Sequence, residues 1–366
     1  AFWKSMWYNK KEKGKRKIEN RKGERLLSAF KLYGKDTLCQ QLAQMEDGAR
    51  LAHGFFFYGD TGLGKKTLAQ WFAARLLCTA PKKPCGSCKS CRSIAASVHP
   101  DVLWVPHSGK KGGFSVETVR SICADLLQPP NSGERKCYIF ADCDEMDPRS
   151  QNILLKAIEE PPDYAYFLFT ARGKQALLPT IRSRILSMPV FPCTEAVCRT
   201  ALLEHGCTAE EADAAIACFH GNIGACLSYL DPSSMLHQTV SLTKQFIHSI
   251  INKDEYMGLC VANQVGKDRD LAYALLLALD AVLRDALALR YDAALPCIGC
   301  DPEGAAALSR TLSAADGQAM HLLLDRALRA RSANVNVQLL LAALLGEWMN
   351  QLTGVTGTDC ARIERT

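Results

Sequence analysis

The sequence predicts an α/β domain with a parallel sheet, followed by two helical domains. From about Leu32 to Met188, short apolar runs alternate with helical patterns, and turn or polar residues bound each run. Continuous apolar runs of this length are typical of strands buried on both faces, and therefore of a parallel sheet covered by helices. After Pro192 these runs disappear. The predicted strands are 55–58, 102–105, 138–141, 166–169 and 185–190.

The helical part is predicted from apolar residues three and four apart, the spacing of an amphipathic helix. The predicted helices are 38–51 and 66–77 in the first domain, 195–205, 209–219 and 223–229 in a small second domain, and 268–291 and 319–330 in a larger third one. The predicted divisions are a basic tail (1–30), the α/β domain (31–188), the small helical domain (189–233), the larger helical domain (234–352) and a C-terminal tail (353–366).

Composition narrows the class of protein. The chain has 366 residues, 48% of them hydrophobic and 22% charged, which is ordinary for a soluble globular protein of two or three domains. It has no apolar run near the ~18 residues that a membrane-spanning helix needs, and no secretory signal pattern. We therefore expect a cytoplasmic protein without a membrane partner.

The charge is unevenly distributed. Residues 1–35 hold twelve Lys or Arg and three Glu, while the whole chain carries +6, so residues 36–366 are slightly acidic overall. Such a tail could contact nucleic acid, but blocks of like charge more often stay disordered without a role, and we favour that interpretation for residues 1–30.

A glycine-rich segment follows the predicted strand 55–58 and opens the predicted helix 66–77. In this context, successive backbone N–H groups can turn inward around a phosphate, and a lysine can reach the β/γ-phosphates. The pattern usually ends in a Ser or Thr that ligates Mg²⁺, but Lys66 occupies that position, and the hydroxyl of Thr67 lies about 100° further around the helix. ATP binding is therefore plausible and hydrolysis is not favoured. The candidate nucleotide-binding residues are Gly59, Gly62, Gly64, Lys65, Lys66 and Thr67.

The residues at the end of the strand predicted at 138–141 also differ from those of a phosphate-loop ATPase. An ATPase of this class needs an Asp for the Mg²⁺ shell and a following Glu that activates water. Aligned by its apolar run, the sequence places Ala141 and Asp142 there, with Asp144 and Glu145 beyond the strand end. The metal-holding carboxylate is therefore predicted to be missing, and we expect weak or absent hydrolysis.

Four of the 17 cysteines lie close together, at Cys78, Cys85, Cys88 and Cys91. Zn²⁺ takes four thiolates tetrahedrally, and closely spaced cysteines allow a turn to wrap the ion. We predict a structural zinc site here, with chance clustering or a redox pair as the alternatives. Cys297 and Cys300 have no second pair nearby, and we interpret them as structural, with metal or redox chemistry left open.

Two further segments carry candidate residues. Asp147 is expected to cap a helix that begins at Pro148 and stops before Pro161. The segment 177–184 precedes the last predicted strand and ends in Arg184. A guanidinium supplied by a neighbouring subunit can stabilise charge on a γ-phosphate, although surface arginines are also common without a role.

Taken in order, these motifs resemble the clamp-loader subunits of the AAA+ class over nearly all of residues 32–348. Each motif is moderately specific, and the ordered set is very specific. The motifs are the phosphate loop, the four-cysteine insert, His99-Pro100-Asp101-Val102, the helix 152–162, the segment 177–184 and the segment 334–339.

The resemblance implies a AAA+ module, a helical lid and a helical collar. The collar would build a five-subunit ring with gamma/tau and delta subunits that opens a sliding clamp and places it on primed DNA. Within the family, the delta-prime branch of the bacterial DNA polymerase III holoenzyme often loses the phosphate-loop and Asp-Glu features but keeps an arginine that acts in trans. That position is Arg184, followed by Ile185 instead of the usual cysteine, and Gly224 stands where motor subunits carry a sensor arginine.

The resemblance therefore implies an interaction subunit, with no polymerase activity and little or no ATPase activity of its own. The alternative is an active motor ATPase of gamma/tau type. A zinc-bearing DNA-binding module unrelated to replication is a third interpretation, but it would need a basic body, and residues 36–366 are slightly acidic.

Overall fold

The structure is a computed structural model, and it describes residues 30–48, 51–109, 113–266, 268–329 and 336–353. The chain divides into two compact units. The first holds residues up to Ala201 together with Gly221–Gly224, and the second holds Leu202–His220 and the residues from Ala225 onward. The three-domain division and its boundaries at 188/189 and 233/234 stay a prediction.

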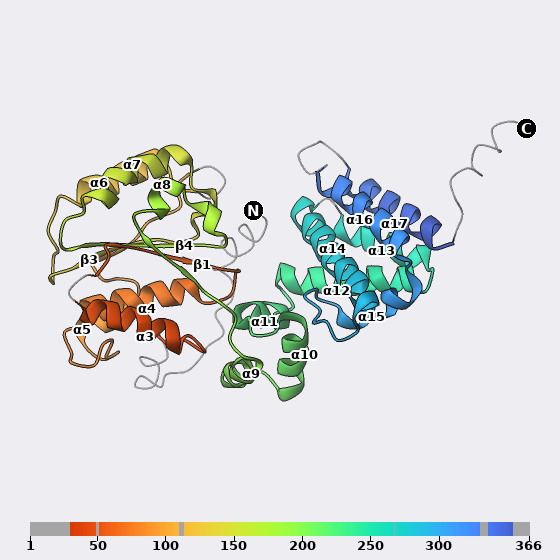
Figure 1. The fold of residues 1–366 in the computed structure, drawn as a ribbon, viewed down its shortest axis with the longest axis horizontal. Coiled ribbons are helices and arrows are strands. Elements are labelled where there is room, and N and C mark those ends of the chain that lie inside the picture. Colours follow the sequence, from red (N-terminus) through yellow and green to blue (C-terminus); the bar gives the residue numbers. More distant parts are fainter. Residues whose placement is uncertain (1–29, 49–50, 110–112, 267, 330–335, 354–366) are drawn as a thin grey trace, which may run out of the picture. The chain divides into compact units, whose positions relative to one another are not determined.

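A five-stranded parallel sheet, seen edge-on in Figure 1, organises the first unit. Its strand order is β2-β3-β4-β1-β5. β4 therefore separates β1, which leads into the glycine-rich loop, from β3, which leads into the acidic segment. The strands are β1 (Gly54–Tyr58), β2 (Val102–Trp104), β3 (Lys136–Phe140), β4 (Ala165–Ala171) and β5 (Leu186–Pro189).

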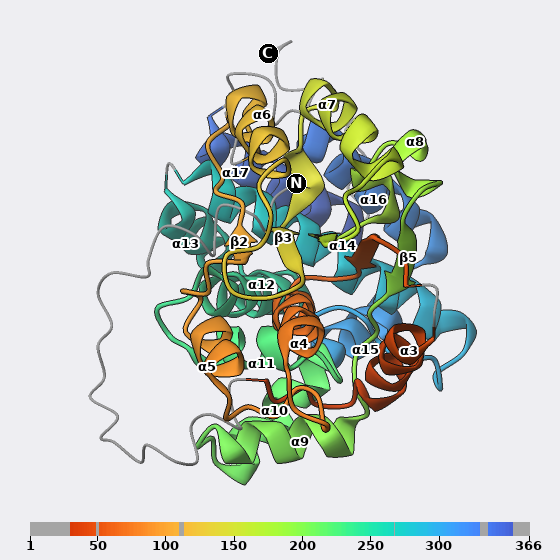
Figure 2. The same ribbon diagram turned by 90° about the vertical axis from the view of Figure 1, so that its left-hand side faces the viewer.

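Helices cover both faces of this sheet. α3, α4 and α5 lie on one side, and α6, α7 and α8 lie on the other, as two views at right angles show (Figures 1 and 2). Two short 3-10 turns, η3 and η4, follow β3 and β4. The bounds are α3 (Asp36–Asp47), α4 (Lys65–Leu77), α5 (Lys89–Ala95), α6 (Val116–Asp125), η3 (Cys143–Glu145), α7 (Pro148–Glu159), η4 (Lys174–Ala176) and α8 (Pro179–Arg182).

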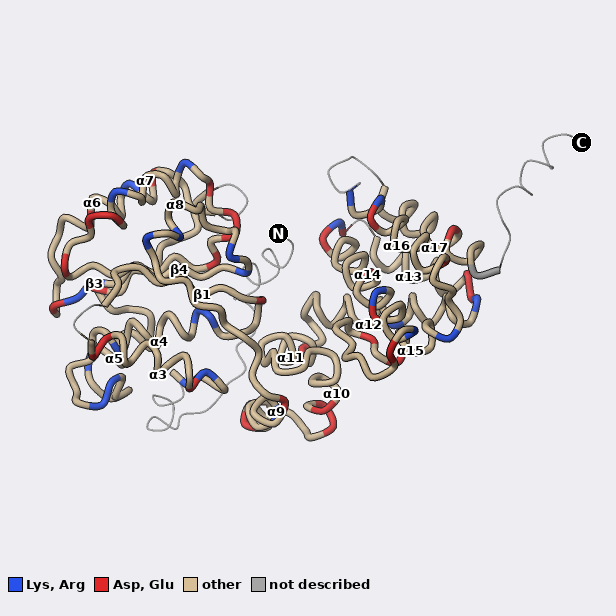
Figure 3. Tube along the Cα trace, viewed as in Figure 1, with Lys and Arg blue, Asp and Glu red and all other residues tan. Residues whose placement is uncertain are grey.

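The strands are almost free of charge, whereas helices and loops carry most of the Lys, Arg, Asp and Glu (Figure 3). The exception is Lys136 at the start of β3, where the Nζ atom lies 2.8 Å from Asp125 Oδ2. That partner makes burial of the ammonium tolerable, because a buried charge is stable only when it is paired.

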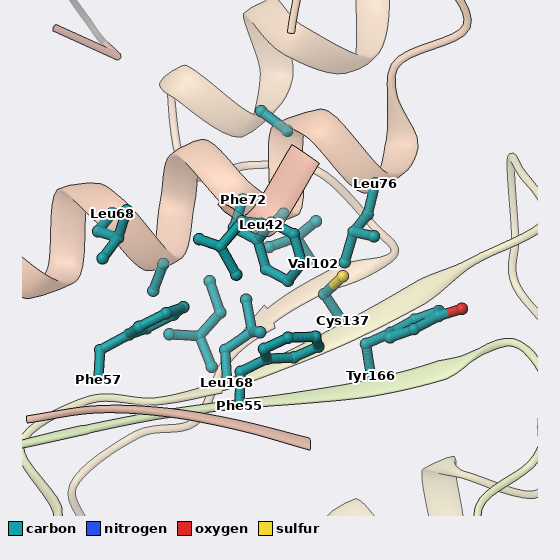
Figure 4. Packing of buried hydrophobic residues seen from close by; sticks show 14 of the residues in the cluster. Leu42, Phe55, Phe57, Leu68, Phe72, Leu76, Val102, Cys137, Tyr166 and Leu168 are labelled. Atoms are coloured by element: carbon teal, nitrogen blue, oxygen red, sulfur yellow. The ribbon is translucent and has the colours of Figure 1, made fainter. Parts of the chain in front are cut away.

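The core beneath β1 explains why α4 lies against the sheet. Phe55 and Phe57 point from β1 toward α4, where Phe72 meets Phe55 edge to face with ring centroids 4.7 Å apart (Figure 4). Leu68 of α4 and Leu42 of α3 fill the same layer. Burying this apolar face fixes the orientation of α4, and with it the loop at the start of the helix.

The second unit is helical throughout its described residues. α14 packs against α12, α15 and α16, and α13 packs against α12 and α17. None of the helices that the structure describes combines the length and the apolarity that crossing a bilayer requires. The helices after the sheet are α9 (Glu195–Glu204), α10 (Ala209–Phe219), α11 (Ile223–Leu230), α12 (Met235–Ile251), α13 (Glu255–Val265), α14 (Arg269–Tyr291), α15 (Pro302–Thr311), α16 (Ala314–Arg329) and α17 (Val337–Thr353).

Candidate functional sites

The glycine-rich loop lies where the sequence predicts it, between β1 and α4. Gly62 and Gly64 have φ angles of 94° and 81°, in the left-handed region that glycine adopts without steric penalty. These angles let the chain reverse direction tightly and enter α4 directly after Gly64. The loop has the backbone conformation that lines a phosphate with N–H groups.

Lys65, the first residue of α4, is buried and folds back on the loop. Its Nζ donates to the carbonyl oxygens of Gly59 at 2.7 Å and Asp60 at 2.6 Å. Burial lowers the pKa of Lys65 to about 8, against the opposing effect of the Asp142 and Asp144 carboxylates. The ammonium is thus held at the loop by bonds that phosphate oxygens could replace.

Lys66 pairs with Asp142, and sequence reasoning did not anticipate this contact. Lys66 Nζ lies 2.5 Å from Asp142 Oδ2. The two residues are those that stand at the Mg²⁺-ligand position of the loop and at the end of the acidic strand. Ala141, at the preceding position, is buried and offers no oxygen ligand from its side chain. These side chains do not fit a Mg²⁺ ion.

The acidic residues beyond β3 make different hydrogen bonds. The backbone N–H of Asp142 donates to Thr170 Oγ1 at 2.9 Å. Asp144 accepts from the backbone N–H of Arg172 at 2.8 Å, which ties η3 to the end of β4. The loop, Asp142 and Arg172 all follow the carboxyl ends of strands, the edge where ligands bind in open α/β sheets.

The segment Gly221–Gly224, which belongs to the first unit, packs directly on the loop. Asn222 Nδ2 donates to Thr61 O at 2.9 Å, and Gly224 N donates to Gly62 O at 3.1 Å. A Cβ atom on Gly224 would lie 2.5 Å from Gly62 Cα. The position assigned to a sensor arginine in motor subunits therefore has no room for a side chain in this arrangement.

The four cysteines predicted to bind zinc come together. Their Sγ atoms all lie within 4.8 Å of one another, and the Cys78–Cys88 and Cys85–Cys91 pairs are each separated by 4.0 Å. A tetrahedral site with Zn–S bonds of about 2.3 Å requires sulfur atoms about 3.8 Å apart. The separations are close to this value and far longer than the S–S bond of about 2.05 Å in a disulfide. The cluster fits a tetrahedral metal ion.

Local turns place hydrogen-bond donors beside two of these thiols, Cys85 and Cys88. The backbone N–H of Cys88 donates to Cys85 Sγ, and that of Cys91 donates to Cys88 Sγ, both at 3.3 Å. Hydrogen bonds from Ser87 and from the Cys88 backbone lower the pKa of Cys85 to about 6. A thiolate is therefore available there at neutral pH, and the thiolate is the form that binds metal.

A nearly buried carboxylate, Glu46 of α3, anchors the cysteine insert. Its oxygens lie 2.8 Å from Arg75 Nε, 3.2 Å from Lys83 Nζ and 2.9 Å from Arg135 NH1. Arg75 also donates from NH1 to the carbonyl oxygen of Lys83 at 2.8 Å. The loop between Cys78 and Cys85 is thereby tied to α3 and α4.

Arg184 lies on the surface after α8, just before β5. Its Nε is 2.7 Å from Glu159 Oε1 at the end of α7, and its NH1 donates to Thr180 O at 2.8 Å. Because β1 and β5 are parallel, Arg184 sits at the amino edge of the sheet, while the phosphate loop follows the carboxyl end of β1. Five residues of strand, at about 3.3 Å each, place the two edges roughly 16 Å apart.

The structure thus gathers the predicted residues into three separate places: the loop residues with Asp142, the four cysteines, and Arg184 beside Glu159. Sequence reasoning missed the partners of these residues. Hydrogen-bond donors and charges far apart in the chain gave no local pattern that would reveal them. The missed partners are Glu159 of Arg184, Thr170 of Asp142 and Asn222 of the loop.

Sheet and loop together define the class: an α/β domain with a phosphate-binding type of loop, followed by helices. The family model for the DNA polymerase III delta subunit matches residues 34–193. A delta-prime subunit of DNA polymerase III from Pseudomonas aeruginosa is 35% identical over 39% of this chain and 44% of that protein. The delta-prime subunit of Escherichia coli is 27% identical over 67% of this chain and 74% of that protein. The chain is thus similar to delta-prime subunits of DNA polymerase III, most strongly in its α/β part.

Tau and gamma subunits of DNA polymerase III are also similar to the chain. A tau/gamma subunit of DNA polymerase III from Haemophilus influenzae is 32% identical over 42% of this chain and 22% of that protein. The chain spans less than half of the Pseudomonas and Haemophilus relatives. A solved gamma-subunit-related protein of Thermotoga maritima is 18% identical, with a TM-score of 0.43 over 86% of this chain and 99% of that protein.

Proposed function

We propose that this chain is a clamp-loader subunit of the replicative DNA polymerase III holoenzyme, of delta-prime type, that is a poor ATPase and donates Arg184 to a neighbour. The observation that carries this proposal is the separation of the two sites. Arg184 lies at the amino edge of the sheet, roughly 16 Å by strand length from the chain's own loop at the carboxyl edge. An arginine so placed is suited to a nucleotide held by another subunit.

The chain's own pocket supports the second half of the proposal. Hydrolysis in this class needs Mg²⁺ and a carboxylate that orients water. Here Lys66 holds the Asp142 carboxylate, and Ala141 supplies no ligand from its side chain. The loop amides and Lys65 retain the capacity to bind phosphate, so nucleotide binding without hydrolysis is consistent with the site.

The remaining roles follow from the resemblance. The four cysteines would hold one structural Zn²⁺ ion, and the helices after residue 188 would act as lid (189–233) and collar (234–352). The partners would be gamma/tau and delta subunits in a hetero-pentamer, the sliding clamp, and primed DNA bound by the assembly at the replisome. The motor alternative is less favoured, because three positions that serve catalysis or nucleotide sensing there are Lys66, Ala141 and Gly224 here.

Reconstitution of the loader with Arg184→Ala tests the trans role. An arginine supplied in this way is worth about 10³–10⁵ in kcat at the site it serves. We expect DNA-stimulated turnover to be lost at the neighbouring site, while gel filtration shows an intact assembly. Arg149→Ala, an exposed arginine on α7, is the matched control and should keep full turnover. Unchanged turnover in the Arg184 variant would remove this residue from the mechanism.

The motor alternative is tested on the isolated chain. We expect no DNA-stimulated ATP turnover above that of a Lys65→Ala variant, which lacks the ammonium at the loop. Turnover that depends on Lys65 would instead assign the chain to the motor type.

A further inference from the structure

The place of the metal ion in the phosphate site is taken by an ion pair of the protein. Lys66 Nζ lies 2.5 Å from Asp142 Oδ2. The two side chains are 46% and 33% exposed, so the pair faces solvent rather than the core. An ammonium in this position can therefore meet a ligand that enters from solution.

The carboxylate of this pair is held by its backbone. Asp142 has φ 54° and ψ 61°, a left-handed conformation that Asp adopts more readily than most residues. The hydrogen bond from its N–H to Thr170 Oγ1 fixes this conformation against β4. Lysine is the mobile member, because its four-carbon side chain can turn while Asp142 stays in place.

The side chains at this place offer few ligands to a divalent ion. Mg²⁺ requires near-octahedral oxygen ligands and is usually bound by one or two carboxylates with phosphates and water. At this place the side chains of positions 66, 141 and 142 offer one carboxylate, already bound by an ammonium. An entering cation would also be repelled by Lys66.

The loop remains arranged for an anion. Asn222 and Gly224 donate to the carbonyl oxygens of Thr61 and Gly62. In a planar trans peptide the N–H points away from the C=O. The bound carbonyls therefore direct the N–H groups of Gly62 and Leu63 to the opposite side of the loop, away from the segment Gly221–Gly224.

We propose that this loop binds the metal-free anion of a nucleoside di- or triphosphate, with Lys66 leaving Asp142 to neutralise phosphate oxygens in place of Mg²⁺. Lys65 exchanges its bonds to Gly59 O and Asp60 O for phosphate oxygens in the same step. No covalent bond is made or broken. The inference concerns the isolated chain and does not rest on the clamp-loader assignment.

Titration calorimetry of the full chain with ADP, ATP and pyrophosphate, each in EDTA and in excess Mg²⁺, tests the proposal. We expect the Kd for ADP and ATP to agree within about twofold between the two conditions. Binding of pyrophosphate with equal affinity would show that the diphosphate alone is recognised and would overturn the nucleoside part. The whole proposal would be overturned if nucleotides bound at least tenfold more tightly in Mg²⁺, or if they bound in neither condition.

Lys66→Thr supplies the decisive variant, because it restores a hydroxyl and frees Asp142. We expect it to bind ATP more weakly than the wild type in EDTA and to gain at least fivefold in Mg²⁺. Lys174→Thr, an exposed lysine on η4, is the matched control and should behave as the wild type. A Lys66→Thr variant that stays indifferent to Mg²⁺ would show that Lys66 does not replace the ion.

Discussion

Gly224→Ala tests the close packing of the segment Gly221–Gly224 on the phosphate loop. Gly224 donates its N–H to Gly62 O at 3.1 Å, and an added Cβ would lie 2.5 Å from Gly62 Cα and 2.6 Å from Gly62 O. Both neighbours are backbone atoms, which cannot turn away as a side chain would. We expect the substitution to separate the two segments or to destabilise them.

The size of the effect follows from three contributions. Overpacking costs about 1–3 kcal/mol, and the lost hydrogen bond costs about 1 kcal/mol. Alanine in place of glycine stabilises a helix by about 1 kcal/mol, which offsets part of this loss. The net expectation is a loss of about 1–3 kcal/mol. Gly346→Ala in α17 is the matched control, because nothing lies within 4 Å of its Cβ position. That variant should gain up to about 1 kcal/mol.

Urea unfolding and amide hydrogen exchange measure the outcome together. We expect a lower unfolding midpoint for Gly224→Ala, together with faster exchange in residues 59–64. Gly346→Ala should raise the midpoint and leave exchange of the loop unchanged. If Gly224→Ala matched Gly346→Ala in both measurements, the packing of Gly224 on Gly62 would be refuted.

Two other predictions concern the metal cluster and a buried carboxylate. Cys88→Ser should lower bound zinc from one ion per chain toward zero and reduce the unfolding midpoint. Cys260→Ser, outside the cluster, should change neither quantity. Equal metal content in both variants would contradict the site. Asp101 is fully buried, and although burial alone would raise its pKa, hydrogen bonds from Asn131 and Ser132 outweigh that effect and lower it. Its stabilising contribution is thus complete above the unfolded-state pKa of about 3.9 and is lost as the pH falls through the lower folded-state pKa. Asp101→Asn should cost about 1–3 kcal/mol at pH 7, and the difference from wild type in denaturant titrations should shrink below about pH 4; a constant difference would show that the charge is not responsible.

The sequence predicted most of the sheet because burial on both faces leaves an unmistakable apolar run. β1 is Gly54–Tyr58 where 55–58 was predicted, and α4 is Lys65–Leu77 where 66–77 was predicted. The prediction was less accurate for β3, which begins at Lys136. That lysine has no apolar signature and is buried only because Asp125 neutralises it. α3 ends at Asp47, short of residue 51, because Gly48 adopts an extended conformation.

The candidate sites were predictable to the extent that their residues are neighbours in the chain. The four cysteines and the glycine-rich loop are local patterns, and both occur where they were predicted. The partnership of Lys66 with Asp142 depends on the strand order, which brings segments distant in the chain to one edge of the sheet. The same is true of Arg184 and Glu159. Such pairs depend on topology, and a single sequence does not display them.

Helix α4 connects the phosphate loop to the four-cysteine cluster. It begins with Lys65 and Lys66 at the loop and is capped at its far end by Cys78. Its 13 residues span about 20 Å. If the four cysteines bind a metal ion, its loss would release only the far end of the helix. A helix is stiff along its axis, so a tilt at that end would displace both ammonium groups. An ion outside the phosphate pocket would in this way help to set the alignment of the lysines within it.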